Sequence, residues 1–380
     1  MDEKMTPRIR FKGFKDDWEE RKLGELFKPS RNKNNNDLYN QKDILAASLG
    51  TELIPKRTFF GLKSTKESVK NYRVVKHGDL IYTKSPIKGF PNGIVRTNKG
   101  NVGIVPSLYC VYQAQKEINT SIIQLYFEDK NRLDFYLFPL VNVGARNNVN
   151  ITDLEFLEGI IKVPKSIEEQ KKIVDFIEHF NKAITLHQKK LDNLQTLKKL
   201  LMQKIFNQEW RFKGFTDPWE RRKLGEVVNV NSGKDYKHLN KGKIPVYGTG
   251  GYMLSVDSFL SEEDGIGIGR KGTINSPYIL KAPYWTVDTL FYVIPKKNYN
   301  LAFVYSIFQK INWKLYDEST GVPSLSKQTI NAIDVTVPIF KEQEKIGSIF
   351  QILDALIASN QQYLDQLKTL KKYLMQNMFV

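Results

Sequence analysis

The sequence predicts an α+β protein in which two mixed α/β domains are separated by a long antiparallel two-helix coiled coil, with a pseudo-two-fold internal repeat. Two observations support this fold class. A segment near the N-terminus returns in the middle of the 380-residue chain, and a segment in the middle returns at the C-terminus. The second repeated segment also carries a sustained heptad pattern, which is typical of paired helices.

The first repeat links residues 10–26 to residues 211–227 at a constant offset of 201. We call these two stretches the opening segments. Their shared residues include, with the second copy in parentheses, Arg10 (Arg211), Phe11 (Phe212), Gly13 (Gly214), Asp16 (Asp217), Trp18 (Trp219), Glu19 (Glu220), Arg21 (Arg222), Lys22 (Lys223), Leu23 (Leu224), Gly24 (Gly225) and Glu25 (Glu226). Such a match predicts two copies of one structural unit.

The second repeat links residues 169–206 to residues 342–379 at an offset of 173. We call these stretches the closing segments. Both begin with a Glu-Gln pair, Glu169-Gln170 and Glu342-Gln343. Because the two offsets differ, the second half is shorter between its repeats, and that intervening sequence shows little similarity between halves. Each half therefore has a shared beginning, a divergent body and a shared end.

Heptad spacing predicts that the closing segments are long helices that pair along an apolar seam. Polar residues interrupt the seam at matching places, His187 with Asn360 and Lys198 with Lys371, and we interpret them as register devices. The alternative is two amphipathic helices packed on separate cores. The predicted apolar seam residues are Ile177, Phe180, Ile184, Leu191, Leu194, Leu201, Phe350, Leu353, Ile357, Leu364, Leu367 and Leu374.

Chain geometry predicts that the two helices run antiparallel. A helix over residues 167–206 would span roughly 60 Å, whereas a compact body of the second half's size is about 35 Å across. The second body cannot carry the chain back along the first helix, so the second helix must start near the end of the first. We expect each opening segment to be fastened close to the end of the opposite helix, so that the chain nearly closes into a circle.

These elements divide the chain into a first domain over residues 1–165, a first long helix over 166–207, a second domain over 208–340 and a second long helix over 341–380. Short β-rich runs alternate with Gly, Pro and Asn turns in both domains. Helical stretches are expected near residues 121–137 and 301–315. The sequence does not reveal the topology of the sheets.

Composition indicates a partner that is a polyanion. The chain has 58 Lys and Arg against 41 Asp and Glu, a formal charge of +17, which suits a nucleic acid or an acidic membrane surface. No long apolar run or secretion leader is found, so neither a membrane span nor export is expected. The single Cys110 is expected to be a buried thiol, and the four histidines have no zinc-ligand spacing, so no metal site is expected.

Two fragments imitate catalytic motifs without their context. Residues 265–269 are glycine-rich but lack the G-x-G-x-x-G spacing of a dinucleotide site, and a tight strand end before Arg270 is the better interpretation. Residues 275–278, Asn-Ser-Pro-Tyr, look like a damaged N-P-P-Y loop of an amino-methyltransferase but have no cofactor-binding glycine motif before them. We therefore predict a binding protein with no catalytic residues.

Polar loops in both bodies supply candidate DNA contacts. Arg and Asn can read guanine and adenine edges with two hydrogen bonds, while Lys, Ser and Thr mostly contact phosphates. Each single loop could equally be a solvated turn. The candidate residues are Lys84, Ser85, Lys88, Asn92, Arg146 and Asn147 in the first body, and Lys234, Lys237, Tyr247, Thr249, Arg270, Lys271, Thr273 and Ser324 in the second.

The order of these motifs resembles the specificity subunit of type I restriction-modification systems, over essentially the full length. The resemblance rests on the doubled Trp-Glu-x-Arg-Lys-Leu-Gly-Glu phrase at Trp18 and Trp219, on residues 245–251 and 268–273, and on the Glu-Gln start of each closing segment. It implies two target recognition domains, each reading one half of a bipartite DNA site. It also implies helices that fix the spacer between the half-sites.

The resemblance further implies partners and cofactors that the chain itself does not supply. Two modification subunits would dock along the helices and provide adenine methyltransferase activity, and two restriction-translocase subunits would join for cleavage, all in the cytoplasm. S-adenosylmethionine, ATP and Mg²⁺ would be used by those partner subunits and not be bound by this chain.

Two other functions stay open from the residues alone. One is a DNA methyltransferase with its own active site, and the other is a coiled-coil scaffold whose charge serves solubility. The acidic residues Glu168, Glu169 and Glu342 in the first helical turns could simply complement the helix dipoles.

Overall fold

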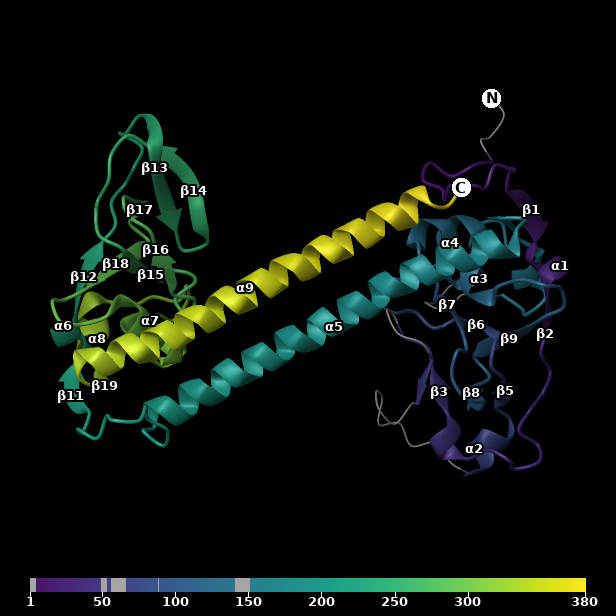
Figure 1. The fold of residues 1–380 in the computed structure, drawn as a ribbon, viewed down its shortest axis with the longest axis horizontal. Helices are drawn as coiled ribbons and strands as arrows, with labels where there is room; N and C mark the ends of the chain where they lie inside the picture. The colour runs from purple at the N-terminus through teal and green to yellow at the C-terminus, as the bar shows by residue number, and fades with distance from the viewer. Residues whose placement is uncertain (1–4, 49–52, 56–65, 88, 141–150) are drawn as a thin grey trace. The chain divides into compact units, whose positions relative to one another are not determined.

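The computed structural model describes residues 5–48, 53–55, 66–87, 89–140 and 151–380. The chain forms two compact units: unit 1 comprises Met1–His187 with Leu364–Val380, and unit 2 comprises Gln188–Tyr363. Both long helices belong to both units (Figure 1). Helix α5 (Ile167–Phe206) begins in unit 1 and ends in unit 2, whereas α9 (Phe340–Asn377) begins in unit 2 and ends in unit 1.

Each unit is built on a four-stranded antiparallel sheet, and the two sheets have the same topology. In unit 1 the strand order is β2 (Phe27–Pro29), β9 (Tyr109–Ala114), β6 (Leu80–Thr83) and β7 (Ile94–Thr97). In unit 2 it is β12 (Val228–Ser232), β18 (Leu290–Pro295), β15 (Gly265–Gly269) and β16 (Tyr278–Leu280). The two divergent bodies therefore share a central sheet of the same topology, although their sequences show little similarity.

The opening segments form the same element in both units. Strand β1 (Glu19–Lys22) pairs antiparallel with β10 (Ile160–Val163), and β11 (Glu220–Lys223) pairs antiparallel with β19 (Asp334–Val337). A single helical turn follows each first strand, α1 (Leu23–Leu26) and α6 (Leu224–Val227). Because β10 and β19 directly precede the long helices, each opening segment is paired with the strand that leads into its own half's helix.

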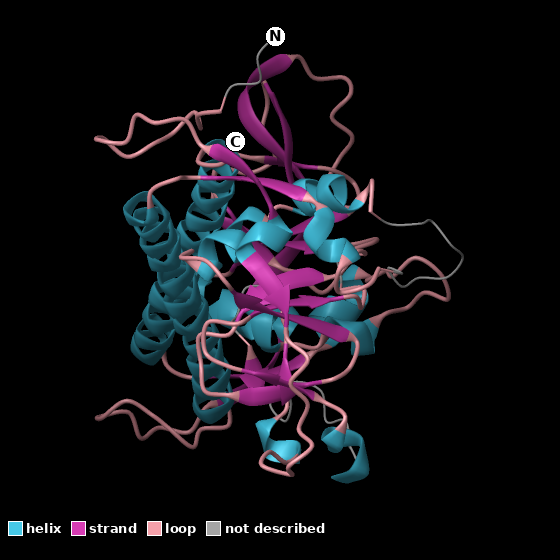
Figure 2. Ribbon diagram, turned by 90° about the vertical axis from the view of Figure 1, so that its right-hand side faces the viewer, coloured by secondary structure: helices cyan, strands magenta, loops and turns pink. Residues whose placement is uncertain are grey.

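Outside this shared centre the units differ in their further strands and helices; Figure 2 draws all helices in cyan and all strands in magenta. Unit 1 adds the pairs β3 (Leu45–Ala46) with β4 (Ile54–Pro55) and β5 (Arg73–Val75) with β8 (Gly103–Val105). Unit 2 adds a three-stranded sheet of β14 (Gly251–Val256), β13 (Lys241–Gly248) and β17 (Trp285–Thr286). The shorter helices are η1 (Gln41–Asp43), α2 (Lys66–Lys70), α3 (Thr120–Tyr126), α4 (Lys130–Leu137), η3 (Glu155–Glu158), α7 (Leu301–Lys310), η4 (Trp313–Tyr316) and α8 (Lys327–Ala332).

Helices α3 and α7 begin at equivalent places and by the same mechanism. Asn119 accepts a hydrogen bond from the backbone of Ser121, and Asn300 accepts one from Phe303 at 3.0 Å, so both asparagines are N-caps. These helices, with α4 and η4 after them, match the helical stretches expected near residues 121–137 and 301–315.

The long helices enter the core of each unit from opposite ends. In unit 1, Ile173 and Ile177 near the start of α5 share a core with Leu374 and Met378 near the end of α9. In unit 2, Phe206 at the end of α5 shares a core with residues near the start of α9, including Ile346, Phe350 and Leu353. The start of one helix thus lies with the end of the other in both units, and the predicted antiparallel fold is confirmed.

The residues of the predicted seam are buried or half-buried along both helices. Six of its residues are buried and six are half-buried in the described structure. The buried residues are Ile177, Leu191, Phe350, Leu353, Leu364 and Leu374, and the half-buried ones are Phe180, Ile184, Leu194, Leu201, Ile357 and Leu367. The helices extend over 167–206 and 340–377, close to the expected 166–207 and 341–380. The limits of the two predicted domains, 1–165 and 208–340, stay predictions.

The Glu-Gln pairs hold the start of each long helix to its unit by side-chain bonds. Glu169 accepts two hydrogen bonds from Arg10, at 2.7 and 2.9 Å, and Glu342 accepts two from Arg211, at 3.1 and 2.7 Å. Both glutamates are buried, at 1% exposure. Our interpretation of these glutamates as simple dipole partners was therefore incomplete, because each is the buried half of an ion pair to its opening segment.

The opening segments also contact the ends of the helices that come from the other half. Trp18 packs edge-on against Phe379, with ring centroids 5.9 Å apart, and Trp219 packs in the same way against Phe206, also at 5.9 Å. In unit 1 the backbone N–H of Ile9 donates to the carbonyl of Asn377 at 2.9 Å. The expectation that each opening segment is fastened near the end of the opposite helix is confirmed, and the two termini lie in one unit.

The matched lysines of the seam reach beyond the helix pair. Lys371 donates to Glu128 at 3.1 Å, just after α3 in unit 1. Lys198 donates to Gln309 of α7 at 2.8 Å and forms an ion pair with Asp354 of α9 in unit 2. We interpreted these lysines as register devices between helices. In the structure both lysines also fasten a helix end to the body of a unit.

Candidate nucleic-acid interface

The predicted cations of the two halves lie at equivalent places on the shared sheet. In unit 1 the hairpin between β6 and β7 ends its pairing at Thr83 and Ile94, and Lys84 and Ser85 follow Thr83 directly. In unit 2 the hairpin between β15 and β16 occupies the same place, and Arg270 and Lys271 follow β15 directly. We call residues 84–93 and 270–277 the hairpin loops of units 1 and 2.

Each hairpin loop contains a glycine in the left-handed backbone region. Gly93 has a φ of 81° and Gly272 a φ of 87°. A side chain at Gly93 would also place its Cβ 1.7 Å from the carbonyl oxygen of Thr83. These positions therefore require glycine, because a residue with a Cβ would be strained at both and would clash at Gly93.

In unit 2 a second loop is fastened to the hairpin loop by backbone hydrogen bonds. The N–H of Gly272 donates to the carbonyl of Pro323 at 2.8 Å, and the N–H of Leu325 donates to the carbonyl of Arg270 at 2.9 Å. Lys271 and Ser324 form an antiparallel bridge between them. Residues 317–325 and the hairpin loop therefore form one surface, which brings Ser324 beside Arg270 and Lys271.

Asp317 shapes the second loop. Its Oδ1 accepts hydrogen bonds from the N–H of Ser319 at 3.0 Å, the hydroxyl of Ser319 at 2.9 Å and the N–H of Ser324 at 2.9 Å. The hydrogen bond from Ser324 and those from Ser319 hold the pKa of Asp317 below its ordinary value. The predicted set lacks Asp317, although an Asp two residues before a Ser at the start of a Gly-Pro loop is a recognisable turn signal.

The turn between β13 and β14 lies against the same surface. Gly248 pairs with Gly251 and leaves Thr249 in the turn, and a Cβ placed on Gly272 would lie 3.9 Å from the Thr249 hydroxyl oxygen. Tyr278, after the hairpin loop, donates its hydroxyl to the carbonyl of Gly248 at 2.6 Å. The structure thus brings Thr249 to the loop residues Arg270, Lys271 and Thr273.

The aromatic residue Tyr247 supports this turn. Its half-buried ring lies 6.1 Å from the ring of Tyr278 and 6.4 Å from that of Tyr252. The predicted set includes Tyr247 but lacks Tyr278, which sequence reasoning had considered only within the imitation methyltransferase loop. Tyr278 instead joins the β13–β14 turn to the hairpin loop.

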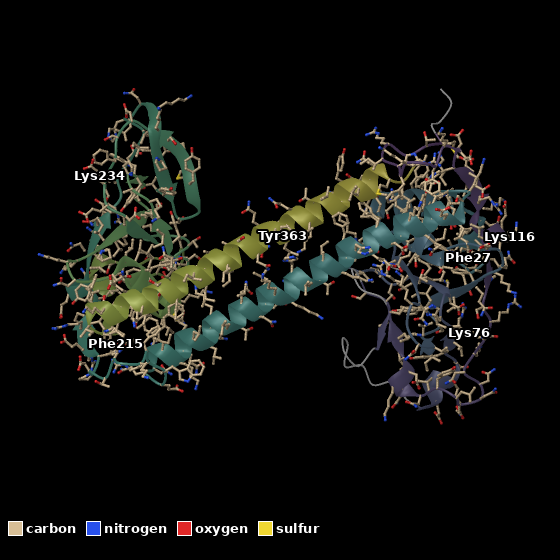
Figure 3. All side chains as sticks on the ribbon, viewed as in Figure 1. Phe27, Lys76, Lys116, Phe215, Lys234 and Tyr363 are labelled. Carbon is tan, nitrogen blue, oxygen red and sulfur yellow. The ribbon has the colours of Figure 1, made fainter. Side chains whose placement is uncertain are left out.

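Lys234 and Lys237 lie on the connection from β12 to β13 and are both exposed. The N–H of Lys234 donates to the carbonyl of Thr286 at 2.9 Å, and Thr286 is the β17 partner of Tyr247. Lys234 is therefore anchored to the three-stranded sheet of unit 2 (Figure 3). No contact in the described structure joins Lys237 to the loop surface.

The predicted cations of unit 2 carry no salt bridge within the part of the chain that the structure describes. This holds for Lys234, Lys237, Arg270 and Lys271, of which Arg270 lies 6.0 Å from the ring centre of Phe291. By contrast, three other exposed cations of the unit, Arg222, Lys223 and Lys281, are paired with carboxylates. Unpaired charge on exposed loops is what binding to phosphates requires.

In unit 1, hydrogen bonds of Asn92 fix the hairpin loop to α4 and to β6. The side-chain amide of Asn92 donates to Asp134 of α4 at 2.7 Å, and the backbone carbonyl of Asn92 accepts a hydrogen bond from the Tyr82 hydroxyl at 2.8 Å. Asn92 thus fixes the loop, while Lys84 and Ser85 are half-buried at its start. The predicted Lys88, Arg146 and Asn147 lie outside the described residues.

The thiol and the glycine-rich segment that could have carried chemistry both lie in the protein core. Burial raises the pKa of the Cys110 thiol to about 12, so Cys110 is a protonated core residue at neutral pH. The glycine-rich residues 265–269 form the buried strand β15. Within the described ranges, no group of three His, Cys, Asp or Glu residues is placed to hold a metal ion. No helix described by the structure has the length and apolar character needed to span a membrane.

Comparison with known proteins identifies related sequences and similar solved structures. Residues 15–196 and 216–369 match the family of the type I restriction modification DNA specificity domain. The chain is 25% identical over 313 residues to the type I restriction enzyme MjaVIII specificity subunit of Methanocaldococcus jannaschii, covering 68% of this chain and 72% of that protein. It is 24% identical over 250 residues to a putative type I specificity subunit of Mycoplasma genitalium, covering 61% of this chain and 64% of that protein.

The fold is similar to that in the crystal structure of the type I restriction-modification system S subunit from M. genitalium. The TM-score is 0.72 at 19% sequence identity, and the match covers 99% of both chains. At that identity the likeness concerns the fold.

Proposed function

Because this chain belongs to the type I restriction modification DNA specificity family, whose domain it matches twice, we propose that each unit reads one half of a bipartite DNA site. The family consists of non-catalytic subunits that give a type I restriction-modification complex its DNA sequence specificity. The further step is the assignment of one half-site to each unit and of the reading surfaces to particular loops.

The observation that carries this proposal is the equivalence of the two hairpin loops. Two sheets of the same topology end in hairpins at the same place, and polar or cationic residues follow the same strand in both. The loop sequences differ completely between units, Lys-Ser-Pro in one and Arg-Lys-Gly in the other. A shared scaffold with different loops is suited to reading two different sequences in the same manner.

The residue types in unit 2 support a division of labour between base and phosphate contacts. The guanidinium of Arg270 can donate two hydrogen bonds to a guanine edge, and this is the commonest base-specific contact in protein–DNA complexes. Lys234, Lys237 and Lys271 are suited to phosphates, and the hydroxyls of Thr249, Thr273 and Ser324 to phosphates or bases. In unit 1 the corresponding candidates are Lys84 and Ser85, with Lys88, Arg146 and Asn147.

The rest of the complex follows from the same proposal. The paired helices fix the spacing between the half-sites, and two modification subunits and two restriction-translocase subunits assemble on the chain in the cytoplasm. Adenine methylation belongs to the modification subunits, which use S-adenosylmethionine, and ATP with Mg²⁺ is used by the translocase subunits. This chain contributes recognition and assembly.

The experiment compares Arg270→Ala with Arg222→Ala in the complex with its modification subunits. Arg222 is an exposed arginine of the same unit that is already paired with Glu220, so it controls for loss of charge. We expect Arg270→Ala to relax one base position of the second half-site, with discrimination reduced about 10-fold or more, while the first half-site stays intact.

The readout is the set of methylated sites found by sequencing modified bases in DNA treated with each complex. Uniform loss of methylation at all sites with Arg270→Ala would make Arg270 a phosphate contact. Relaxation of both halves at once would contradict the assignment of one half-site to each unit.

A further inference from the structure

Val322 is an aliphatic side chain that the second loop of unit 2 presents to solvent. It is 66% exposed and lies at the tip of residues 317–325, between Gly321 and Pro323. The two other aliphatic side chains of this loop and of the hairpin loop, Leu325 and Ile274, are buried in the core of the unit. The charges and hydroxyls that the proposed function assigns to DNA leave Val322 without a role.

The tip that carries Val322 is tied to the hairpin loop. The backbone N–H of Glu318 donates to the carbonyl of Ser324 at 3.1 Å and closes the base of the tip. The carbonyl of Pro323, the residue after Val322, accepts the N–H of Gly272 at 2.8 Å. The position of Val322 is therefore set relative to the residues that directly follow β15.

The local sequence also restricts the conformations of Val322. A residue that precedes proline avoids the helical region of backbone space, and the proline ring fixes its own φ. A β-branched side chain is stiff at χ1. Val322 thus has little conformational freedom to lose when its side chain contacts a ligand, which favours binding.

The surroundings of Val322 favour DNA over a protein partner. Lys271 forms an antiparallel bridge with Ser324, and the carbonyl of Arg270 accepts the N–H of Leu325. Neither cation has a salt bridge within the described parts of the chain. An apolar side chain fixed beside unpaired cations suits a ligand that is anionic on its outside and apolar in places within its grooves.

The acidic residues of the second loop do not oppose this interpretation at the tip itself. Asp317 accepts the N–H of Ser324 at 2.9 Å, and Glu318 accepts the hydroxyl of Ser326 at 2.9 Å. Both carboxylates therefore take part in hydrogen bonds at the base of the loop. They precede Val322 by five and four residues in the chain.

An aliphatic side chain can read one feature of the major groove. Thymine presents a methyl group at C5 there, and apolar side chains contact it, whereas arginine reads guanine edges in the same groove. Because the loops that carry Val322 and Arg270 are joined by direct hydrogen bonds, both side chains reach the same stretch of DNA.

We infer that Val322 contacts the C5-methyl group of a thymine in the second half-site. Base pairs are stacked about 3.4 Å apart, so this thymine lies within about two base pairs of the base that Arg270 reads. The inference rests on the proposed function, which gives the second half-site to unit 2. Burial of one methyl group favours the thymine about fourfold over a base that lacks it.

The test removes the methyl group from the DNA and the side chain from the protein. Each thymine of the second half-site is replaced singly by deoxyuridine, which lacks only the C5-methyl group. Binding of the complex with its modification subunits is measured by fluorescence anisotropy at one salt concentration. We expect uracil to weaken the binding of the unchanged complex about fourfold at one thymine, close to the position that Arg270→Ala relaxes.

The variant Val322→Ser should bind the thymine duplex about fourfold more weakly and should no longer distinguish uracil at that position. Val322→Ile keeps a branched aliphatic side chain and should retain the uracil effect. Leu315→Ser is the matched control, because Leu315 is 78% exposed in the same unit but lines a separate pocket with Phe206 and Lys310. This control should also retain the uracil effect.

The outcomes separate this inference from the proposed function. A sequence-specific complex in which uracil has no effect at any thymine of the second half-site would overturn the inference alone, and this measurement needs no variant. The same uracil effect with and without Val322→Ser would also overturn it, because another residue would then contact the methyl group. A complex that binds all DNA sequences alike would overturn the proposed function itself.

Discussion

At the scale of single residues, the Glu-Gln pair that begins each long helix has the same contacts in both units. Gln170 accepts the backbone N–H of Asn119 at 3.0 Å and donates to the carbonyl of Pro164 at 2.8 Å. Gln343 accepts the N–H of Asn300 at 3.0 Å and donates to the carbonyl of Pro338 at 2.9 Å. Each pair therefore joins an opening segment, the N-cap of a body helix and the start of a long helix.

We predict that Glu169→Gln and Glu342→Gln destabilise the protein by similar amounts, about 2 kcal/mol each, because each removes the negative charge of a buried ion pair and replaces one accepting oxygen by an amide group that cannot accept. The glutamine keeps the shape, so the helix start stays in place. Glu169→Gln should cost slightly more, since Glu169 also accepts a long hydrogen bond of 3.4 Å from Trp18, whereas the indole N–H of Trp219 has no acceptor in the described structure. Urea unfolding of both variants checks this. A loss at one position only would show that the two joints are not equivalent.

Residue chemistry in the loops could be predicted, but their assembly could not. Arg270, Lys271 and Ser324 were predicted from residue type alone. Their proximity depends on the backbone bonds of Gly272 and Leu325, which join segments about fifty residues apart and leave no pattern in the sequence. For Asn92 the residue type was misleading: it suggested a contact to a DNA base, but the side-chain amide donates a hydrogen bond to Asp134 within the protein.

At the scale of elements, the seam lysines distinguish the two units. Lys371 faces Glu128, which also lies 3.8 Å from the buried Arg96 of β7. Lys198 faces Gln309 and Asp354, and the Asp354 side chain is 32% exposed against 14% for Glu128. The charge cluster of unit 1 is therefore less accessible to water than that of unit 2.

We predict that Lys371→Met destabilises unit 1 by roughly 2–3 kcal/mol and that Lys198→Met destabilises unit 2 by about 1 kcal/mol. Removing Lys371 leaves a largely buried carboxylate with Arg96 and the amide of Gln124 beside it, whereas Asp354 can be hydrated when Lys198 is removed. Thermal unfolding of the two variants, made in the same background, measures the difference. A larger loss with Lys198→Met would contradict this account of the two clusters.

The same cluster predicts a dependence of stability on pH. Burial raises the pKa of Glu128, but the charges of Lys371 and Arg96 and the hydrogen bonds from Lys371 and Gln124 outweigh burial, so the pKa lies below its ordinary value of 4.5. A lowered folded-state pKa stabilises above the unfolded value, and this contribution is lost as the pH falls through the folded value. We therefore expect the free energy of unfolding to decline as the pH drops below 4.5.

Chemical denaturation at a series of pH values tests this expectation, with Lys371→Met as the control that removes the main cause. The variant should lose less stability than the unchanged chain over the acidic range, because its Glu128 pKa is no longer lowered by Lys371. Equal losses in both chains would assign the acid sensitivity to other carboxylates.

The long helices were predictable because their heptads extend through about forty residues, whereas the sheets were not. Strands such as β6 and β15 are short, their pairing is decided by distant partners, and buried strand positions accept any apolar residue of suitable size. The common topology of the two sheets therefore persists without residue identity between Leu80–Thr83 and Gly265–Gly269. The lysines were interpreted only within the helix pair because a heptad pattern contains no information about the bodies beside it.

At the scale of the whole molecule, each half supplies the helix end on which the other half's opening segment packs. Unit 1 binds the end of α9 through Trp18 and Glu128, which contact Phe379 and Lys371. The end of α5 carries Phe206 and Lys198 at the corresponding positions. A second copy of the first half could therefore supply the missing helix end.

We predict that a chain of residues 1–207 forms a homodimer and, with modification subunits, methylates a symmetric site built from two copies of the first half-site. Light scattering coupled to size-exclusion chromatography gives the mass, and sequencing of modified bases gives the site. Phe206→Ala in the truncated chain is the control and should weaken the dimer, because it removes the ring that replaces Phe379. A truncated chain that stays monomeric and inert with modification subunits would show that the helix ends are not interchangeable.

The central claim is that two units of common design read two different half-sites at a fixed separation. The most direct measurement is the map of methylated bases in a genome that carries this chain with its modification subunit. We predict a single bipartite motif with two unlike specific halves and a nonspecific spacer of constant length. A continuous motif, or a motif with one specific half, would contradict the claim.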